Sequence, residues 1–361
     1  MAAAIRPASR PIACGNTVGI FFTHSIPHSP PHKSMYPVLI GEGIWALPSY
    51  FTMLMLGFFV GTLLMRREAI RVGFDPVKTV DLCFALVIAS IAGARLAHIL
   101  FDGFFMDYVW LCIDPNELAE HLPSGKACTE SAQCLAAQNK GYNIGANCID
   151  GYCIPERDCL RPLMFWAGGL TYYGGFILAV ATAWFLAHRW KWSFLKLSDM
   201  AAPIIALGLA FGRMGCFLAG CCFGKVTDVP WAIRFPQYSD AWKRHRDLYH
   251  DALVAQHDEI GEWLSLPVHP TQLYELFGSL AIFAFLWFTR KHTSFSGQKI
   301  AILLIAYGIL RFIIEFWRDD DRGGVLLSTS QWISIPLCII GVVLIIVGVR
   351  KKPTEAPKQN C

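Results

Sequence analysis

The sequence predicts an all-α polytopic membrane protein with seven transmembrane helices, an N-terminus outside, a cytoplasmic C-terminus and a small cysteine-rich extracytoplasmic insert. The prediction depends on a low content of charged residues, a series of long apolar stretches and an uneven distribution of Lys and Arg. Of 361 residues, 54% are hydrophobic and 16% are charged, whereas soluble domains carry roughly 25% charged residues. The composition therefore argues against a disordered chain and an ordinary soluble enzyme. A net charge of +4 is too small for a nucleic-acid-binding face.

Seven stretches are long or apolar enough to cross a bilayer, which requires about 20 mostly apolar residues in a helix. They cover residues 46–65, 82–101, 163–187, 200–222, 271–289, 300–317 and 331–349. Each can cross with modest tilt.

The basic residues predict the orientation, because short cytoplasmic loops retain Lys and Arg. The segments after the first, third, fifth and seventh spans are rich in them, as at Arg66, Arg189, Arg290 and Arg350. Residues 35–45, before the first span, contain none. These four segments are therefore expected in the cytoplasm, and the N-terminus outside.

The predicted organisation has four parts, and one long loop adds to it. Residues 1–34 are expected to be a disordered extension or a mis-assigned start, because their one apolar run is too short for a secretory signal peptide. A transmembrane domain is expected at 35–352, with a cysteine-rich periplasmic insert at 104–160 and a cytoplasmic tail at 353–361. The loop at 225–268 carries aromatic and basic residues that suit either a membrane surface or a solvated loop with a short helix.

The insert holds an even number of cysteines, on the side of the membrane expected to be oxidising. They are Cys112, Cys128, Cys134, Cys148, Cys153 and Cys159. Such a set predicts up to three disulfides, although the pairing cannot be deduced from sequence. A zinc site is the alternative, but the insert lacks the usual C-x2-C spacing.

Ionisable and hydroxyl side chains inside the spans gather at one depth. With the predicted orientation, the outer half of the membrane holds Tyr50, Arg95, Tyr173, Arg213, Glu275, Arg311 and Glu315. Charged groups in a bilayer are costly and usually face a cavity or one another. We therefore expect one polar chamber near the outer leaflet, and transport is disfavoured because no polar path to the cytoplasmic side is visible.

The sixth span is the most informative, because Tyr307, Arg311 and Glu315 recur every four residues and so share one helix face. A neighbouring Glu reduces the cost of burying an Arg. A purely structural ion pair is the alternative, but such pairs stabilise poorly compared with apolar packing.

Three further runs place polar residues beside glycines or at a helix start. Arg213 lies in the glycine-rich run 212–224, which suits a bound phosphate held by two guanidinium hydrogen bonds, or simply tight helix packing. Gln272 and Glu275 share a face of the helix that follows Pro270. The run 168–175 surrounds two tyrosines with glycines and suits either a substrate groove or a packing seam.

These motifs together resemble those of the bacterial prolipoprotein diacylglyceryl transferases. The resemblance rests on three motifs: Gly-Arg-x-Gly-x-Phe at 212–217, His-Pro-Thr-Gln-Leu-Tyr-Glu at 269–275 and Tyr-Gly-x-x-Arg-Phe-x-x-Glu-Phe-x-Arg at 307–318. The resemblance covers about residues 36–352, interrupted by the insert. It implies a seven-span enzyme of the bacterial inner membrane whose active site faces the outer leaflet.

The resemblance also implies the reaction: diacylglyceryl transfer from phosphatidylglycerol to the lipobox cysteine of a prolipoprotein signal peptide, with release of glycerol phosphate. It implies no cofactor, no metal and no nucleic acid. The catalytic residues expected from it are Arg311, Glu315, Tyr307, Tyr173 and His269. The expected substrate-binding residues are Arg213 for the lipid phosphate, with Tyr50, Arg95, Gly174, Gly175, Gln272 and Glu275.

The chain departs from the family pattern at three positions. Tyr173 stands where many members have His, while Cys216 and Cys221 stand where they have Asn and Glu. With Cys222, these cysteines are read first as small buried hydrophobes, second as a disulfide, and third as a metal site or acyl-accepting thiol. The departures leave two alternative functions open: a relative acting on a different acceptor, or a non-catalytic phospholipid-binding protein.

Overall fold

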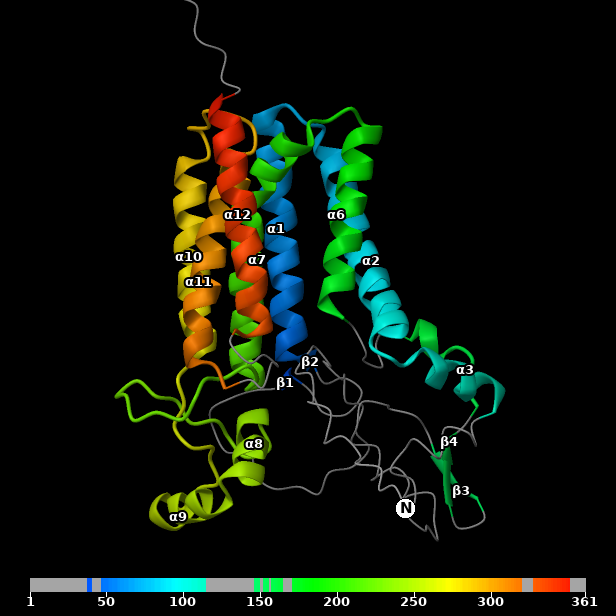
Figure 1. Ribbon diagram of the computed structural model, residues 1–361, viewed down its shortest axis with the longest axis vertical. Coiled ribbons are helices and arrows are strands. Elements are labelled where there is room, and N and C mark those ends of the chain that lie inside the picture. Colours follow the sequence, from blue (N-terminus) through cyan, green and yellow to red (C-terminus); the bar gives the residue numbers. More distant parts are fainter. Residues whose placement is uncertain are drawn as a thin grey trace, which may run out of the picture. The chain divides into compact units, whose positions relative to one another are not determined.

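The structure is a computed structural model that describes residues 38–40, 47–114, 146–149, 152–155, 157–164, 171–319 and 327–350 (Figure 1). The described residues form ten α-helices, two short 3-10 helices and two small antiparallel sheets. They divide near Val80 and Trp190 into two compact units, which are described separately. The predictions for residues 1–34 and 353–361 lie outside the described residues.

The first unit is a bundle of five long helices. They are α1 (Ser49–Val72), α7 (Phe194–Ala219), α10 (Thr271–Thr289), α11 (Gln298–Ile314) and α12 (Thr329–Arg350). Helix α7 packs against α1, α10 and α11, and α12 packs against α11 (Figure 1). Strands β1 (Val38–Ile40) and β2 (Leu47–Pro48) pair just before α1.

Two short helices, α8 (Asp240–Leu248) and α9 (His250–Ile260), occupy the long loop between α7 and α10 (Figure 1). Ser239 caps the start of α8 by accepting a hydrogen bond from the Trp242 N–H. The Leu266 N–H donates to Nδ1 of the buried His245, so the end of the loop folds back onto α8. The loop is therefore an ordered layer at the end of the bundle where α7 stops.

The ends of α7 explain how the bundle is joined. Ser193 caps its N-terminus, and Gly220 stops the helix with a left-handed φ of 71°, which glycine adopts without steric cost. One turn into α7, Asp199 accepts hydrogen bonds from the N–H groups of Gly297, Lys299 and Ile300 at 2.6, 2.8 and 3.1 Å. Asp199 thus supplies the cap that the start of α11 lacks in its own sequence.

At the end of the bundle that the charge pattern predicts to be cytoplasmic, Glu68 joins two helices. Its side chain is only 2% exposed and lies 2.6 Å from Arg71 and 2.9 Å from Arg290. Because Arg290 follows α10, this carboxylate ties α1 to α10.

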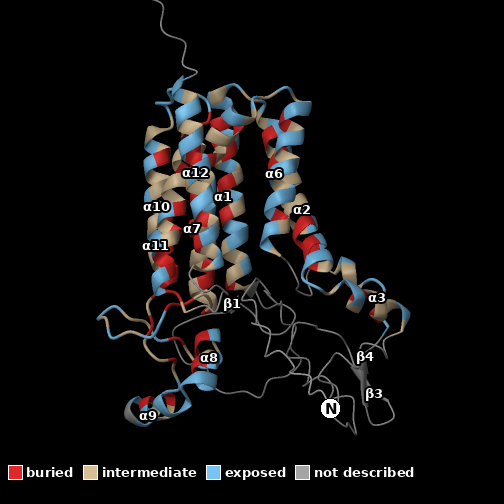
Figure 2. Ribbon diagram, in the orientation of Figure 1, coloured by how far each residue is buried: buried red, intermediate tan, exposed pale blue. Residues whose placement is uncertain are grey.

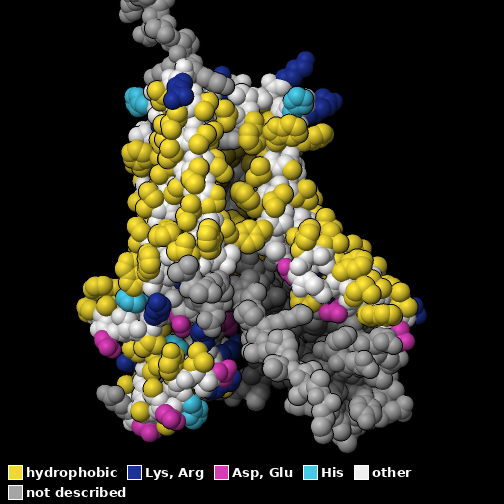
Figure 3. Space-filling model, viewed as in Figure 1, with side chains coloured by type: hydrophobic (Ala, Val, Ile, Leu, Met, Phe, Trp, Pro, Cys, Tyr) yellow, Lys and Arg dark blue, Asp and Glu magenta, His cyan; other side chains and the backbone are white. Residues whose placement is uncertain are grey.

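Six of the described helices are long and apolar enough to cross a membrane: α1, α7, α10, α11, α12 and α2 (Pro76–Phe101). On the face shown in Figure 3, hydrophobic side chains cover the long helices, while charged side chains gather at their ends. Figure 2 shows exposed residues all along these outer surfaces, with buried residues turned inward. An apolar exterior of this kind suits contact with lipid. The chain is a multi-pass membrane protein.

The third of the seven expected spans, 163–187, differs from the prediction. Helix α6 begins only at Tyr172 and ends at Arg189. It has only 18 residues, and its last turn contains the polar residues His188 and Arg189. Helix α6 is therefore not among the described helices that are long and apolar enough to cross a membrane. The 3-10 helix η2 (Arg161–Leu163) occupies the expected start of the span.

The second unit contains most of α2, with α3 (Phe105–Ile113), η2 and α6. Helices α2 and α6 approach closely at glycines: a Cβ on Gly174 would lie 2.2 Å from the Ala97 Cβ and 2.3 Å from the Gly93 carbonyl oxygen. A Cβ on Gly175 would lie 2.7 Å from the Ser90 carbonyl oxygen. The glycine run therefore forms a packing seam of small residues.

The described part of the insert contains one disulfide, between Cys112 and Cys159. It also contains a hairpin of β3 (Ala146–Ile149) and β4 (Tyr152–Pro155), in which Cys148 is paired with Cys153 in register. Cys128 and Cys134 lie outside the described residues. One of the three disulfides predicted at most is thus present, and the other two stay predictions.

Candidate active site

A cluster of charged side chains lies where α7 and α11 end and α10 begins. Arg213 Nη2 is 2.9 Å from Glu275 Oε1, and the Tyr307 hydroxyl donates to the same oxygen at 2.9 Å. Arg311 Nη1 is 3.7 Å from Glu275 Oε2, and its Nη2 is 2.9 Å from Glu315 Oε2. The structure thus brings together four of the residues expected in the outer polar chamber, with Tyr307 beside them, and Arg311 pairs with Glu315 as predicted.

The start of α10 positions Glu275. Thr271 Oγ1 donates to the Cys222 carbonyl at 3.0 Å, and Gln272 Nε2 donates to the Cys221 carbonyl at 2.7 Å. Both side chains are completely buried. These two bonds fix the first turn of α10 against the segment after α7, and they place Glu275 one turn further along, opposite Arg213. In the structure Gln272 is therefore a positioning residue.

The segment after α7 runs between two other parts of the cluster. The Gly224 N–H donates to the His269 carbonyl at 2.9 Å, and the Lys225 N–H donates to the Trp317 carbonyl at 2.8 Å. A Cβ on Gly224 would lie 2.6 Å from the Trp317 carbonyl oxygen and 2.7 Å from the His269 Cβ. Only glycine fits so close an approach, which accounts for the last glycine of the run 212–224.

Arg318 also contacts the cluster, in which Arg213 is the most accessible arginine. Glu315 lies 3.9 Å from Arg318 Nε as well as 2.9 Å from Arg311. Among the three arginines, Arg213 has the most exposed side chain at 19%, against 9% for Arg311 and 1% for Arg318. A partly accessible guanidinium group suits an anionic ligand.

Tyr50 lies at the start of α1 against the end of α7. A Cβ on Gly215 would lie 3.0 Å from the Tyr50 ring and 3.3 Å from its Cα. The close approach places the half-buried Tyr50 within electrostatic range of Arg213. The expectation that Tyr50 and Arg213 share one site agrees with this geometry.

His269 lies at the edge of the cluster. Its Nδ1 is 3.2 Å from the Tyr274 hydroxyl, and its ring contacts those of Tyr274 and Trp317. Partial burial lowers the pKa of His269 below its ordinary value, so the neutral imidazole is favoured near neutral pH. Trp231, from the loop after α7, donates to the Tyr274 hydroxyl at 2.7 Å.

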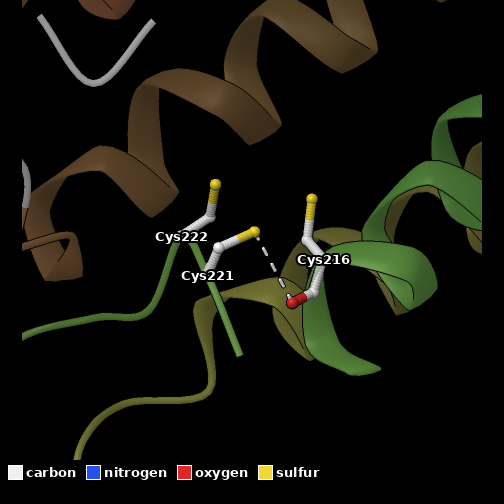
Figure 4. Close-up of side chains that lie close together, drawn as sticks. All are labelled: Cys216, Cys221 and Cys222. Atoms are coloured by element: carbon white, nitrogen blue, oxygen red, sulfur yellow. Dashed lines mark hydrogen bonds between the residues drawn. The ribbon is translucent and has the colours of Figure 1, made fainter. Parts of the chain in front are cut away.

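Three cysteines converge at the end of α7 (Figure 4). The sulfur atoms of Cys216, Cys221 and Cys222 all lie within 4.8 Å of one another. All three are free thiols, and Cys221 Sγ donates to the Cys216 carbonyl at 3.7 Å. Cys216 follows Arg213 by three residues on α7, so both side chains lie on the same helix face.

The remaining expected site residues belong to the second unit. Arg95 donates from Nε to the Pro162 carbonyl at 2.8 Å and from Nη2 to the Arg161 carbonyl at 2.6 Å, so it ties η2 to α2. Its guanidinium also lies over the Tyr108 ring. Tyr173 is 48% exposed on α6, and Gly174 and Gly175 lie in the seam with α2. Substrate contact by these four residues stays a prediction.

Comparison with known proteins decides the family. The sequence model of the prolipoprotein diacylglyceryl transferases matches residues 37–121 and 144–347. The chain belongs to the prolipoprotein diacylglyceryl transferase family. It is 32% identical over 327 residues to a phosphatidylglycerol–prolipoprotein diacylglyceryl transferase of Neisseria gonorrhoeae, covering 86% of this chain and 95% of that protein. A protein of the same name from Bordetella bronchiseptica is 31% identical, covering 87% and 95%.

In this transferase family member, sequence reasoning missed three participants in the cluster. Ser330, at the start of α12, accepts a hydrogen bond from Arg311 Nη2 at 2.8 Å. Thr271 and Arg318 lie within the motifs at 269–275 and 307–318, but the sequence predicted no role for either residue. The signal for Arg318 was its position three residues after Glu315, whereas a serine in an apolar helix gives no comparable signal.

Proposed function

We propose that this chain transfers the diacylglyceryl group of phosphatidylglycerol to the lipobox cysteine of prolipoproteins, forming a thioether and releasing glycerol phosphate. The observation that supports the proposal is the Arg213–Glu275–Arg311–Glu315 cluster, in which a partly accessible Arg213 lies at one end of a membrane bundle. The named activity of the relatives supports it. The enzyme is a transferase.

The charges of the cluster suit the departing group. In the transfer, a thiolate attacks the glyceryl carbon, and the electron pair of the broken C–O bond leaves on a phosphate oxygen. Arg213 binds the phosphate with paired hydrogen bonds, which a guanidinium provides and an ammonium does not. Arg311, oriented by Glu315 and Ser330, stabilises the charge that grows on the leaving oxygen in a site of low dielectric.

The other expected site residues take positioning or proton-handling roles. Tyr307 and Glu275 hold each other and orient both arginines, while Gln272 fixes the start of α10. Tyr50 lines the lipid side of Arg213. His269, neutral near pH 7, accepts a proton at the edge of the site. Tyr173, Arg95, Gly174 and Gly175, on α2 and α6, are proposed as further substrate contacts.

The proposal includes a topology. The chain crosses the bacterial inner membrane seven times, with α6 as the third span, the N-terminus outside, the C-terminus in the cytoplasm and the active site facing the outer leaflet. Basic residues at one side of the spans support this orientation. The Cys112–Cys159 disulfide supports an oxidising location for the insert. The family model passes over residues 122–143, which suits an insert at 104–160 within a domain at 35–352.

The test is mass spectrometry of a lipobox peptide incubated with the purified chain and phosphatidylglycerol. The expected result is a diacylglyceryl adduct on the peptide cysteine, absent with Arg311→Gln. Arg67→Gln is the matched control, because Arg67 is exposed at the other end of α1. A well-folded parent that binds the lipid but gives no adduct would refute the transfer to prolipoproteins.

A second candidate is transfer to a different acceptor. Tyr173, Cys216 and Cys221 favour it, because they replace polar residues that many family members carry. Under this alternative, the parent consumes phosphatidylglycerol with another thiol or hydroxyl acceptor and leaves the lipobox peptide unmodified. If the parent retains phosphatidylglycerol and shows no turnover with any acceptor, the chain is a phospholipid-binding protein.

A further inference from the structure

Cys216, in the last turn of α7, and Cys221 and Cys222, just after it, form a cluster that the charged site does not use. Their sulfur atoms lie within 4.8 Å of one another and point to a common space (Figure 4). Cys216 is buried, while Cys221 and Cys222 are partly exposed. Thiols that converge in this way, with one side open, match the ligand type of soft and borderline metal ions.

The backbone around the cluster is held in place. Gly220 ends α7, and the Cys221 N–H returns to the Cys216 carbonyl at 3.2 Å. Cys222 has a φ of 61°, a left-handed conformation that is strained for a non-glycine residue. The bonds from Gln272 and Thr271 to the carbonyls of Cys221 and Cys222 fix this conformation. The turn brings two consecutive cysteines beside the last turn of a helix.

The surrounding charges suit a thiolate-bound metal. A zinc ion with three thiolates carries a net charge of −1. Arg213 lies one turn before Cys216 on the same face of α7. Its guanidinium group therefore offsets part of the negative charge of three thiolates.

We propose that Cys216, Cys221 and Cys222 bind a zinc ion whose fourth position takes the thiol of the acceptor cysteine; this inference rests on the proposed function. A Zn–S bond of about 2.3 Å places sulfur atoms about 3.8 Å apart in a tetrahedron. Side-chain rotation from the observed separations is sufficient to reach that spacing. Among the described residues no His, Asp or Glu joins the group, so the fourth position is left to water or substrate, as in catalytic zinc sites.

The zinc would activate the attacking sulfur. A free thiol has a pKa of about 8.5, and a thiol bound to zinc is deprotonated at neutral pH, with its proton released to solvent. The zinc-bound sulfur then donates its electron pair to the glyceryl carbon. The C–O bond breaks, its electron pair leaves on the phosphate oxygen beside Arg213 and Arg311, and the zinc keeps its oxidation state. The metal and the phosphate site would act on the two ends of the same displacement.

Metal binding is tested with Co²⁺ as the probe, on the full chain purified in detergent, reduced and stripped with a chelator. Titration should give one Co²⁺ per chain, with a thiolate-to-metal charge-transfer band displaced by Zn²⁺. Cys216→Ser, Cys221→Ser and Cys222→Ser should each weaken Co²⁺ binding at least tenfold. Cys338→Ser, which alters a free thiol on α12, should bind as the parent does. Equal binding by the parent and Cys221→Ser would overturn the proposal.

The open fourth position is tested by adding a lipobox peptide to the Co²⁺-loaded chain. The charge-transfer band should intensify with the cysteine peptide and stay unchanged with a peptide carrying serine at that position. No difference between the two peptides would overturn the substrate-binding part. A disulfide joining any two of the three cysteines in the protein as isolated from membranes, seen by mass spectrometry, would also overturn the proposal.

Activity separates this inference from the proposed function. Stripping the parent should reduce adduct formation at least tenfold, and Zn²⁺ should restore it without any substitution. Transfer at an unchanged rate by the stripped chain would overturn the zinc proposal and leave the transferase intact. If Co²⁺ binding depends on the three cysteines and the charge-transfer band responds to the cysteine peptide, but no diacylglyceryl group is transferred, the metal site is supported and the proposed reaction is refuted.

Discussion

Glu275 is the residue on which the cluster depends. It is completely buried and pairs with Arg213, Arg311 and the Tyr307 hydroxyl, which come from α7 and α11. A carboxylate without exposure depends on such partners for its charge, and the two arginines depend on it in turn. Its loss should therefore affect stability and activity together.

Glu275→Gln tests this dependence. The amide removes the charge and leaves the guanidinium groups of Arg213 and Arg311 under-compensated, so we expect a loss of about 3 kcal/mol in the free energy of unfolding. Transfer should fall at least tenfold. Thermal unfolding in detergent and the peptide assay measure the two effects. Tyr307→Phe, which removes one hydrogen bond and keeps all charges, should cost only about 1 kcal/mol; equal losses in both variants would contradict this account.

The second prediction at the scale of residues concerns Arg213. Arg213→Gln should lower the transfer rate roughly 100-fold or more, because it removes a charge that meets the leaving phosphate. Arg213→Lys should recover little of it, since an ammonium cannot form the paired hydrogen bonds. Initial rates of adduct formation measure both, with Arg67→Gln as the control. A lysine variant near the parental rate would show that charge alone suffices.

The residues show where sequence reasoning succeeded. Arg311 and Glu315 are four positions apart on one helix, so their pairing could be predicted from helix geometry. The role of Glu275 as a shared partner could not, because it depends on how α7, α10 and α11 pack. The role of Arg95 stays a prediction: a charge in a span indicated function, and in the described structure its side chain donates to the backbone carbonyls of Arg161 and Pro162.

At the scale of elements, the seam between α2 and α6 depends on glycine. Gly174→Val should destabilise the packing by about 1–3 kcal/mol, because the new side chain meets the backbone of Gly93 and the side chain of Ala97. Gly208→Ala in α7 is the matched control, since a Cβ there has no neighbour within 4 Å. That control should be neutral or gain about 0.5–1 kcal/mol. Thermal unfolding compares the two, and a tolerated Gly174→Val would contradict the seam.

Helix α8 gives a pH prediction. Burial lowers the pKa of His245, whose Nδ1 accepts the Leu266 N–H. The unfolded chain takes up a proton as the pH falls through about 6.5, while the folded chain does not. The free energy of unfolding should therefore be highest above about pH 6.5 and decrease below it.

The variant His245→Asn should remove much of this acid sensitivity, because Asn keeps an acceptor and does not titrate. His250→Asn, at an exposed position on α9, should leave it unchanged. Thermal unfolding at several pH values measures the effect. A parent whose stability does not change below pH 6.5 would exclude His245 as its source.

The helix ends show which helix bounds could not be predicted from the sequence. Apolar stretches located the long helices well, because a helix in lipid needs length and apolar surface. The bounds shifted where capping decides them: α7 starts at Phe194 after the Ser193 cap and stops before Gly220, so Cys221 and Cys222 leave the expected span. That turn creates the cysteine cluster, which helical spacing alone does not predict.

At the scale of the whole molecule, the basic residues predict a cytoplasmic C-terminus and an outer insert. A reporter fused after Cys361 should be active in the cytoplasm, and the Cys112–Cys159 disulfide should form only in cells with an oxidising periplasm. Thiol labelling of cells with and without periplasmic disulfide formation measures the second point. Reduced Cys112 and Cys159 in wild-type cells, or a periplasmic C-terminus, would contradict the topology.

The most direct measurement counts both products of one reaction. Purified chain, phosphatidylglycerol and a lipobox peptide are incubated together, and peptide thioether and free glycerol phosphate are quantified over time. A single displacement beside Arg213 and Arg311 requires the two to appear one to one, and both to fall together in Arg213→Gln. Glycerol phosphate released without the thioether, or a rate unchanged in Arg213→Gln, would contradict the proposed transfer at this site.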